Sequence, residues 1–284
     1  MLGNGKKNIG FDSNFYTCIS GAVVYNPATI TAAFKARVIA AGGAITATQE
    51  SACLTLVTNL VNNNLWSKMK IIYPFVGGTS NSCKINLVDA NYTATFSSGW
   101  TFTALGGTPN GANTFMLANG FNSSVQLTPY NTSWSYYSRT NNTSNGFELG
   151  VQNGFVNTDR IGMSIRFSGN NQSNMNDYNA GSGLIQNTAT TSTGLYFQSR
   201  ISTTSQQFFR NLTQLGATNT NTMTTPLPNA TFTFATLSFN DGINYLSTNR
   251  QCAFAHAGTG LTSAEAATFY SNVQTFQTTL SRNV

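Results

Sequence analysis

The chain has 284 residues, of which only 8% are charged: 14 Lys and Arg, 8 Asp and Glu, with one His and a formal net charge of +6. About a quarter of the residues in an average globular protein are charged, so general acids, general bases and metal ligands are scarce here and we expect no enzyme. Hydrophobic residues make up 40% of the chain, including 20 Phe and 11 Tyr, which is enough for a large core.

The N-terminal segment, residues 1–25, contains the closest basic pair, Lys6 and Lys7. Lys and Arg are otherwise scattered, so we predict no nucleic-acid partner and interpret the segment as an arm that docks on another protein. The segment lacks the apolar centre of a secretory signal. No apolar run reaches the roughly 20 residues of a membrane helix, so no membrane insertion and no Sec export are expected.

Residues 26–70 show helical periodicity and are predicted to form a pair of helices joined by a glycine turn. Apolar residues recur at every fourth position of the first helix, at Ile30, Phe34 and Val38. The second helix is expected to begin at a capping box in which Thr46 and Gln49 bond each other's backbone amides.

From residue 71 to about His256 the period changes to two, and short strands separated by Gly, Asn, Ser and Pro predict an antiparallel β-sandwich. Alternation is strictest at Ile161, Met163, Ile165 and Phe167. The intervening residues are expected to face solvent or a partner: Gly162, Ser164, Arg166 and Ser168. A slip of one residue at Ala235-Thr236 indicates a β-bulge or a crossing between sheets.

Helical periodicity returns over residues 262–282, where Thr262 and Glu265 form a second capping box. This helix is predicted to pack on the sandwich, so residues 71–284 are expected to form one domain closed by it.

Four widely spaced cysteines lack the CxxC pairs of zinc or redox sites: Cys18, Cys53, Cys83 and Cys252. Two disulfides remain open as an alternative, but the apolar surroundings favour buried free thiols and folding in a reducing cytoplasm.

Three segments resemble a known family. They are Leu65-Trp66-Ser67-Lys68-Met69-Lys70-Ile71-Ile72-Tyr73-Pro74-Phe75-Val76-Gly77-Gly78, Ser138-Arg139-Thr140-Asn141-Asn142-Thr143, and the stretch from Cys252-Ala253-Phe254-Ala255 through Gly260-Leu261-Thr262 to Arg282-Asn283-Val284. They resemble structural proteins of the virions of phages that infect Bacteroidota. The resemblance covers roughly residues 33–284.

The resemblance implies a mainly β protein with a concanavalin A-like (laminarin G-like) jelly roll, preceded by the helical pair and closed by the C-terminal helix. It also implies synthesis in the host cytoplasm, location in the virion and other virion proteins as partners. Because virion appendages are symmetric, a homo-oligomer is expected. The position on the particle, whether tail, fibre, spike or capsid, stays open.

Jelly rolls of this type include β-glucanases, in which retaining hydrolysis needs two carboxyl groups about 5 Å apart. Glu148 stands alone on its strand, Asp159 is distant and Asp241 lies in a turn, so no catalytic residues are predicted. His256 is expected to share a strand face with Cys252 and to be a packed or interface histidine, not part of a catalytic dyad.

Aromatic and polar side chains offer candidates for glycan binding: Tyr136, Arg139 and Tyr178. Trp134 and Tyr136 share one strand face and Tyr137 occupies the other, and one of these faces must be core. Asp177, beside amide carbonyls, could ligate calcium, but a single carboxylate makes a poor site. We therefore predict no metal and no cofactor, with calcium at Asp177 the one ion left open.

These features predict a lectin-like virion component that attaches to host-surface glycans. The alternatives are a purely structural capsid decoration protein and a free carbohydrate-binding module.

Overall fold

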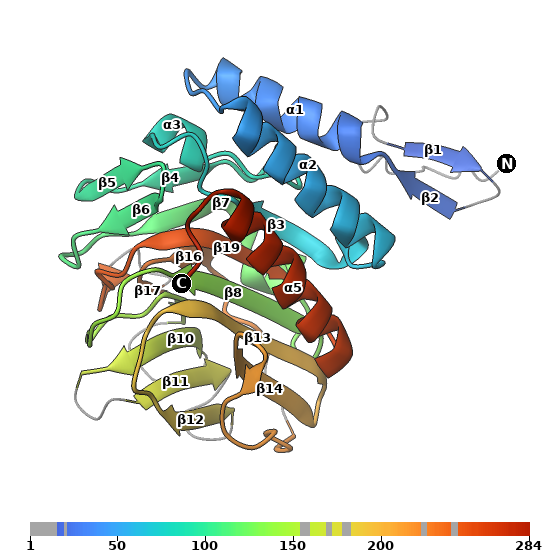
Figure 1. Cartoon of the computed structure of the whole chain (residues 1–284). Helices are drawn as coiled ribbons and strands as arrows, with labels where there is room; N and C mark the ends of the chain where they lie inside the picture. The colour runs from blue at the N-terminus through green and yellow to red at the C-terminus, as the bar shows by residue number, and fades with distance from the viewer. Residues whose placement is uncertain are drawn as a thin grey trace, which may run out of the picture.

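The computed structural model describes residues 16–19, 22–153, 160–168, 172–177, 183–222, 226–239 and 244–284. Within these ranges the chain folds as two packed β-sheets with a layer of helices on one side (Figure 1). A separate hairpin, β1 (Tyr16–Ile19) and β2 (Ala22–Tyr25), precedes this body and pairs Tyr16 with Tyr25. The predicted sandwich with flanking helices is confirmed, and the molecule is a mixed α and β structure.

The larger sheet, as far as the structure describes it, has nine strands. Its main path runs β12 (Leu184–Thr188), β11 (Gln172–Asp177), β10 (Arg160–Phe167), β9 (Leu149–Gln152), β16 (Thr231–Phe234), β7 (Met116–Asn122) and β4 (Ala94–Phe96). Two short strands lie off this path: β17 (Leu237–Phe239) pairs parallel to β9, and β18 (Asn244–Tyr245) pairs antiparallel to β17. The other pairings in this sheet are antiparallel.

The second sheet has eight strands within the same ranges. Its main path runs β15 (Thr213–Gln214), β14 (Ser205–Arg210), β13 (Gly194–Ser202), β8 (Thr132–Ser138), β19 (Cys252–Gly258), β6 (Gly106–Pro109) and β5 (Trp100–Thr103). β3 (Met69–Tyr73) pairs with β19, so the first strand after the helical pair lies beside the last strand of the chain. Short helices α3 (Ser80–Cys83) and α4 (Ser123–Gln126) lie in the connections.

The helical layer comprises α1 (Pro27–Ala40), α2 (Ala47–Asn62) and α5 (Ser263–Thr279), on the outer face of the eight-stranded sheet (Figure 1). The predicted caps are confirmed: both Thr46–Gln49 and Thr262–Glu265 form complete capping boxes. Ile30, Phe34 and Val38 are buried as their spacing predicted.

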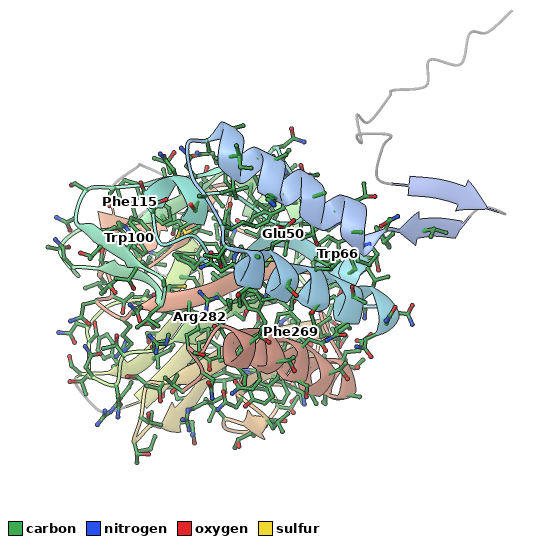
Figure 2. All side chains as sticks on the ribbon, turned by 45° about the horizontal axis from the view of Figure 1, so that its top comes forward. Glu50, Trp66, Trp100, Phe115, Phe269 and Arg282 are labelled. Carbon is green, nitrogen blue, oxygen red and sulfur yellow. The ribbon has the colours of Figure 1, made fainter. Side chains whose placement is uncertain are left out.

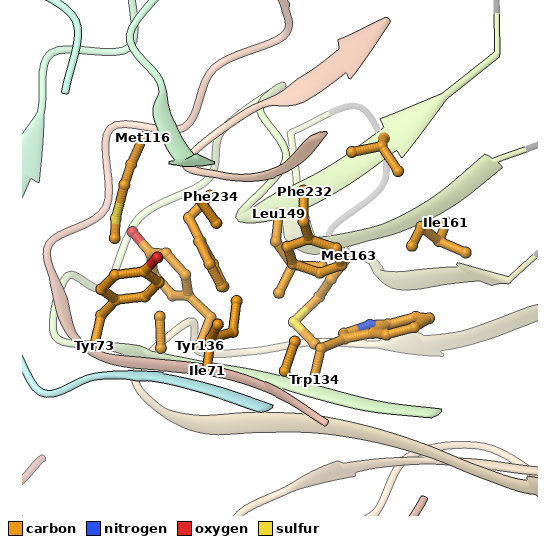
Figure 3. Close-up of a cluster of buried hydrophobic side chains, with 14 of the residues drawn as sticks. Ile71, Tyr73, Met116, Trp134, Tyr136, Leu149, Ile161, Met163, Phe232 and Phe234 are labelled. Atoms are coloured by element: carbon orange, nitrogen blue, oxygen red, sulfur yellow. The ribbon is translucent and has the colours of Figure 1, made fainter. Parts of the chain in front are cut away.

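Two hydrophobic cores result. One fills the space between the sheets and includes Tyr73, Trp134 and Phe234 (Figure 3). The other lies between the eight-stranded sheet and the helices and includes Phe34 and Phe269. Alternate residues of the eight-stranded sheet therefore enter different cores, and both of its faces are covered.

Arg282 ties the C-terminal residues to the second core (Figure 2). Its buried guanidinium donates to the carbonyls of Phe75 at 2.8 Å, Pro74 at 2.7 Å and Ala253 at 2.9 Å, and to Gln277 Oε1 at 2.6 Å. Burial lowers the pKa of Arg282 to about 10, so the side chain stays charged at neutral pH.

The prediction that one side of β10 faces solvent or a partner is wrong for Gly162 and Ser164, which are both buried within the chain itself. The segment before β9 covers this side: ring atoms of Phe147 lie 3.2 Å from where a Gly162 Cβ would be. A Cβ at this position would lie closer to the Phe147 ring than most Cβ contacts do, so glycine permits this close packing.

The slip at Ala235-Thr236 is a break between two strands of one sheet, since β16 and β17 both belong to the nine-stranded sheet. Ala235 has a φ of +65°, and its N–H and carbonyl bond Glu148 and Thr248 at 2.7 and 3.0 Å. The alternative of a crossing between sheets is not observed.

Cys53, Cys83 and Cys252 are buried free thiols, as expected, and burial raises the pKa of the Cys53 and Cys83 thiols to about 12. The Cys18 side chain lies outside the described part of the structure. No helix among the described residues is both long and apolar enough to cross a membrane.

Candidate ligand-binding cleft

A shallow cleft of about 360 Å³ opens at the end of the sandwich where β6 finishes and β19 begins. Three loops line it, at residues 110–113, 144–146 and 246–249. Most of the lining side chains are amides and hydroxyls, contributed by Asn110, Asn113, Asn145, Asn249, Ser144 and Ser247. None of the described residues that line it is charged.

Asn110 and Asn249 use their amide oxygens inside the protein. Asn110 Oδ1 accepts the Ala112 N–H at 2.9 Å, and Asn249 Oδ1 accepts from Asn142 Nδ2 at 2.9 Å. Their Nδ2 groups have no acceptor among the described residues. Each of these amides therefore has an N–H donor available for a ligand oxygen.

Asn145 follows the same pattern, because its Oδ1 accepts a hydrogen bond from the Ser168 hydroxyl. The Asn113 side chain makes no hydrogen bond to the described part of the chain and has both donor and acceptor capacity available. The cleft as a whole is thus richer in available donors than in acceptors.

The backbone of the lining loops is unusual. Leu246 adopts a φ of +45°, rare for a side chain of this size, and is 50% exposed. Its carbonyl accepts the Phe147 N–H at 2.7 Å, and Gly146 packs so closely on Ser247 that an added Cβ would lie 2.3 Å from its backbone. Such strain persists only where the surroundings fix the backbone, and it holds one apolar side chain at the edge of a polar cleft.

A fully buried ion pair lies behind the cleft. Glu148 Oε1 accepts from Arg250 Nη1 at 2.5 Å and from the Thr248 hydroxyl at 2.7 Å, and Oε2 accepts the Ile165 N–H at 2.7 Å. Burial raises the pKa of Glu148, while Arg250 opposes the rise. With no exposed surface, Glu148 cannot reach a ligand in the cleft.

The other arm of Arg250 positions the loops. Nη2 donates to the Asn142 carbonyl at 3.0 Å and to the Arg166 carbonyl at 3.1 Å. Asn142 in turn donates to Asn249, so the ion pair and the lining amides belong to one hydrogen-bonded network. Hydrogen bonds from buried groups therefore hold the lining loops in position.

The sequence-based candidates fall elsewhere. Tyr136, proposed as a sugar-binding ring, is fully buried between the sheets and donates to the Arg250 carbonyl at 2.7 Å, so it is a core residue and that prediction is wrong. Trp134 is buried on the same side, and Tyr137 is buried on the other side beneath the helices. Both faces of β8 are core because the helical layer covers the second one.

Arg139 is half-buried and bonds other parts of the protein. Its Nε donates to the Arg282 carbonyl and its Nη1 to Gln251 Oε1, both at 2.7 Å. It fastens the C-terminal residues to the sheet and does not line the cleft.

Asp177 is the last residue of β11, but its side chain and all of Tyr178 lie outside the described residues, so both remain predictions. The described residues contain no group of three or more His, Cys, Asp or Glu side chains that could hold a metal ion.

His256 is a packed histidine, as expected, but it does not share a strand face with Cys252. A register shift in β19 between Cys252 and Phe254 turns Cys252 into the core between the sheets. His256 faces the helical layer and contacts Phe269, with ring centroids 4.6 Å apart. The irregularity removes any Cys-His dyad.

None of the cleft asparagines was predicted from the sequence as a binding residue. The pairs Asn110-Gly111 and Asn145-Gly146 are turn signals that locate two of the loops. No short-range sequence signal indicates that these two turns lie beside residue 249. Because asparagine is abundant elsewhere in the chain, these positions do not stand out.

No family model and no curated protein matches the sequence. Among solved structures, a mutant Trypanosoma rangeli sialidase displaying trans-sialidase activity aligns with a TM-score of 0.53 and 11% identity over 78% of this chain and 39% of that chain. The T. rangeli sialidase aligns with a TM-score of 0.51 and 10% identity over 78% and 38%.

Domain 4 of AbnA, an extracellular arabinanase from Geobacillus stearothermophilus in complex with arabinotriose, aligns with a TM-score of 0.44 and 10% identity over 71% of this chain and 98% of that domain. The chain spans about two fifths of the length of the sialidases. At such low identity the sialidase matches concern the fold alone: this chain has a β-sandwich similar to one found within sialidases.

Proposed function

We propose that this chain is a non-enzymatic, lectin-like component of a phage virion that binds neutral glycans of the host surface in the amide-lined cleft. The observation that carries the proposal is the set of amide N–H groups of Asn110, Asn145 and Asn249, whose oxygens are already used within the protein. The virion assignment is supported by the resemblance of residues 65–78 and 252–284 to phage structural proteins.

A neutral sugar fits the chemistry of the cleft. Sugar hydroxyl and ring oxygens accept hydrogen bonds from amide N–H groups, and the apolar Leu246 side chain can contact sugar C–H groups. Acidic sugars are usually bound by Arg or Lys, and neither occurs among the lining residues that the structure describes. The cleft therefore favours neutral over acidic glycans.

Binding without hydrolysis is supported by the position of Glu148. Glycosidases place two carboxyl groups beside the scissile bond, about 5 to 10 Å apart. Glu148 is buried and paired with Arg250, and the described residues of the lining include no carboxylate. We expect the parent chain to release no reducing sugar from glycans. Glu148→Gln should therefore give the same result as the parent chain.

The test is a glycan array followed by titration calorimetry with the best neutral ligand. Asn113→Gly removes one amide, and the introduced glycine tolerates the φ of +56° at this position. Asn145→Ala removes a second amide. Each should weaken binding about tenfold, the equivalent of about 1.4 kcal/mol for a lost hydrogen bond. Asn91→Ala, at an exposed asparagine outside the cleft, is the matched control and should bind normally.

A blank array would contradict glycan binding and favour the capsid decoration protein. Mass spectrometry of purified virions tests location separately. Absence from particles combined with glycan binding would favour the free carbohydrate-binding module.

A further inference from the structure

A second group of polar side chains lies inside the sandwich, near the start of β8, whereas the cleft lies beyond the end of that strand. Thr132 and Trp134 come from β8, and Gln198 comes from the neighbouring β13, where it pairs with Trp134 in the register. All three side chains are fully buried.

Four polar atoms of this group have no hydrogen-bond partner in the described structure: Thr132 Oγ1, Trp134 Nε1, Gln198 Nε2 and Gln198 Oε1. Buried polar atoms are almost always paired, because an unpaired one loses its bonds to water and gains nothing in return. Four such atoms on two adjacent strands therefore point to a partner that the described residues do not supply.

The described side chains of the opposite sheet that face Trp134 do not supply that partner. Phe232 faces Trp134 with ring centroids 6.2 Å apart, and Met163 and Ile161 lie across the interior from it (Figure 3). These side chains are apolar, so they neither donate nor accept conventional hydrogen bonds.

We propose that Thr132, Trp134 and Gln198 form an internal binding site for ordered water between the two sheets. The indole and amide N–H groups donate, the Gln198 carbonyl accepts, and the Thr132 hydroxyl does both. A water molecule, with two donors and two acceptors, matches this set, and buried waters typically make about three such bonds. The large side chains packed around the site favour water over a bulkier ligand.

The experiment uses the full chain and NMR of its indole N–H groups, with Trp134→Phe used to assign the Trp134 signal. The Trp134 Nε1–H should show a cross-relaxation peak to water. The sign of this peak should be that of a water molecule with a long residence time. Trp100 is an internal control, because its Nε1 donates to the Phe115 carbonyl at 3.1 Å (Figure 2). Absence of the Trp134 peak would overturn the proposal.

A variant gives an independent readout. Gln198→Met keeps the length of the side chain and removes both amide atoms, so it should weaken the water peak and lower the melting temperature. Gln186→Met, at an exposed glutamine of β12, is the matched control and should change neither. A higher melting temperature for Gln198→Met would show that the Gln198 amide is not hydrogen-bonded to water, which would contradict the proposal. A crystal structure with larger density than water at the site would also overturn the proposal.

Discussion

His256 has a defined hydrogen-bonding state. The Ser133 hydroxyl donates to the Thr259 carbonyl at 2.7 Å, so its oxygen is left to accept from His256 Nε2–H at 3.2 Å. Ser135 then donates to Nδ1 at 2.8 Å. Both ring nitrogens are satisfied in the neutral form.

Burial lowers the pKa of His256 to about 3 from an ordinary 6.5. The unfolded chain therefore takes up a proton below pH 6.5 while the folded chain does not, and stability present above pH 6.5 is lost as the pH falls. We expect the free energy of unfolding to drop by about 1.4 kcal/mol per pH unit between pH 6.5 and 3 from this residue. Urea unfolding at several pH values measures the slope.

His256→Gln is the comparison for that experiment, since glutamine does not titrate. Its slope should be shallower than that of the parent chain over the same pH range. Equal slopes would mean that the folded chain protonates His256 as readily as the unfolded chain does.

At the scale of elements, the cap of α5 is a local device whose contribution can be measured. Thr262 Oγ1 accepts the Glu265 N–H, and the Glu265 carboxylate accepts the Thr262 N–H and also pairs with Lys68 at 2.5 Å. Thr262→Ala should lower the free energy of unfolding by about 1 kcal/mol, as measured by denaturant unfolding.

Thr275→Ala, on the exposed face of the same helix, is the control for Thr262→Ala. It should leave stability unchanged or raise it slightly, because alanine has the higher helix propensity. Equal losses in the two variants would show that the cap contributes nothing specific.

The helices and caps could be predicted because their signals are local: a capping box spans four residues and an apolar stripe recurs within one helix. Gly162 and Ser164 are buried where exposure was expected, and for Gly162 the cover is Phe147, which lies outside β10 and before β9 in the chain. The two-sided burial of β8 was missed for the same reason, since Tyr137 is covered by a helix over one hundred positions away.

At the scale of the whole molecule, the net positive charge of the chain is not concentrated at the candidate cleft. The chain carries a net charge of +6, yet the cleft is lined by neutral groups. The affinity for a neutral glycan should therefore change little between about 50 and 500 mM NaCl, since no ion pair is available to be screened. Titration calorimetry at several salt concentrations measures this, and a tenfold loss would point to ionic contacts in place of the amides.

The cleft itself could not be predicted from the sequence. Its amides come from three loops between residues 110 and 249, and they meet only when β6, β9 and β19 have taken their places. Asparagine is abundant along the whole chain, so composition does not indicate which asparagines converge.

The pairing of β3 with β19 and the bonds from Arg282 to Pro74 and Phe75 have a consequence for how fast the chain folds. These contacts join residues about two hundred positions apart, so the entropy of closing a very long loop must be lost before they form. High contact order of this kind slows folding, and the apolar strands stay exposed in the meantime. Expression at low temperature, which disfavours aggregation during that interval, should raise the yield of folded protein.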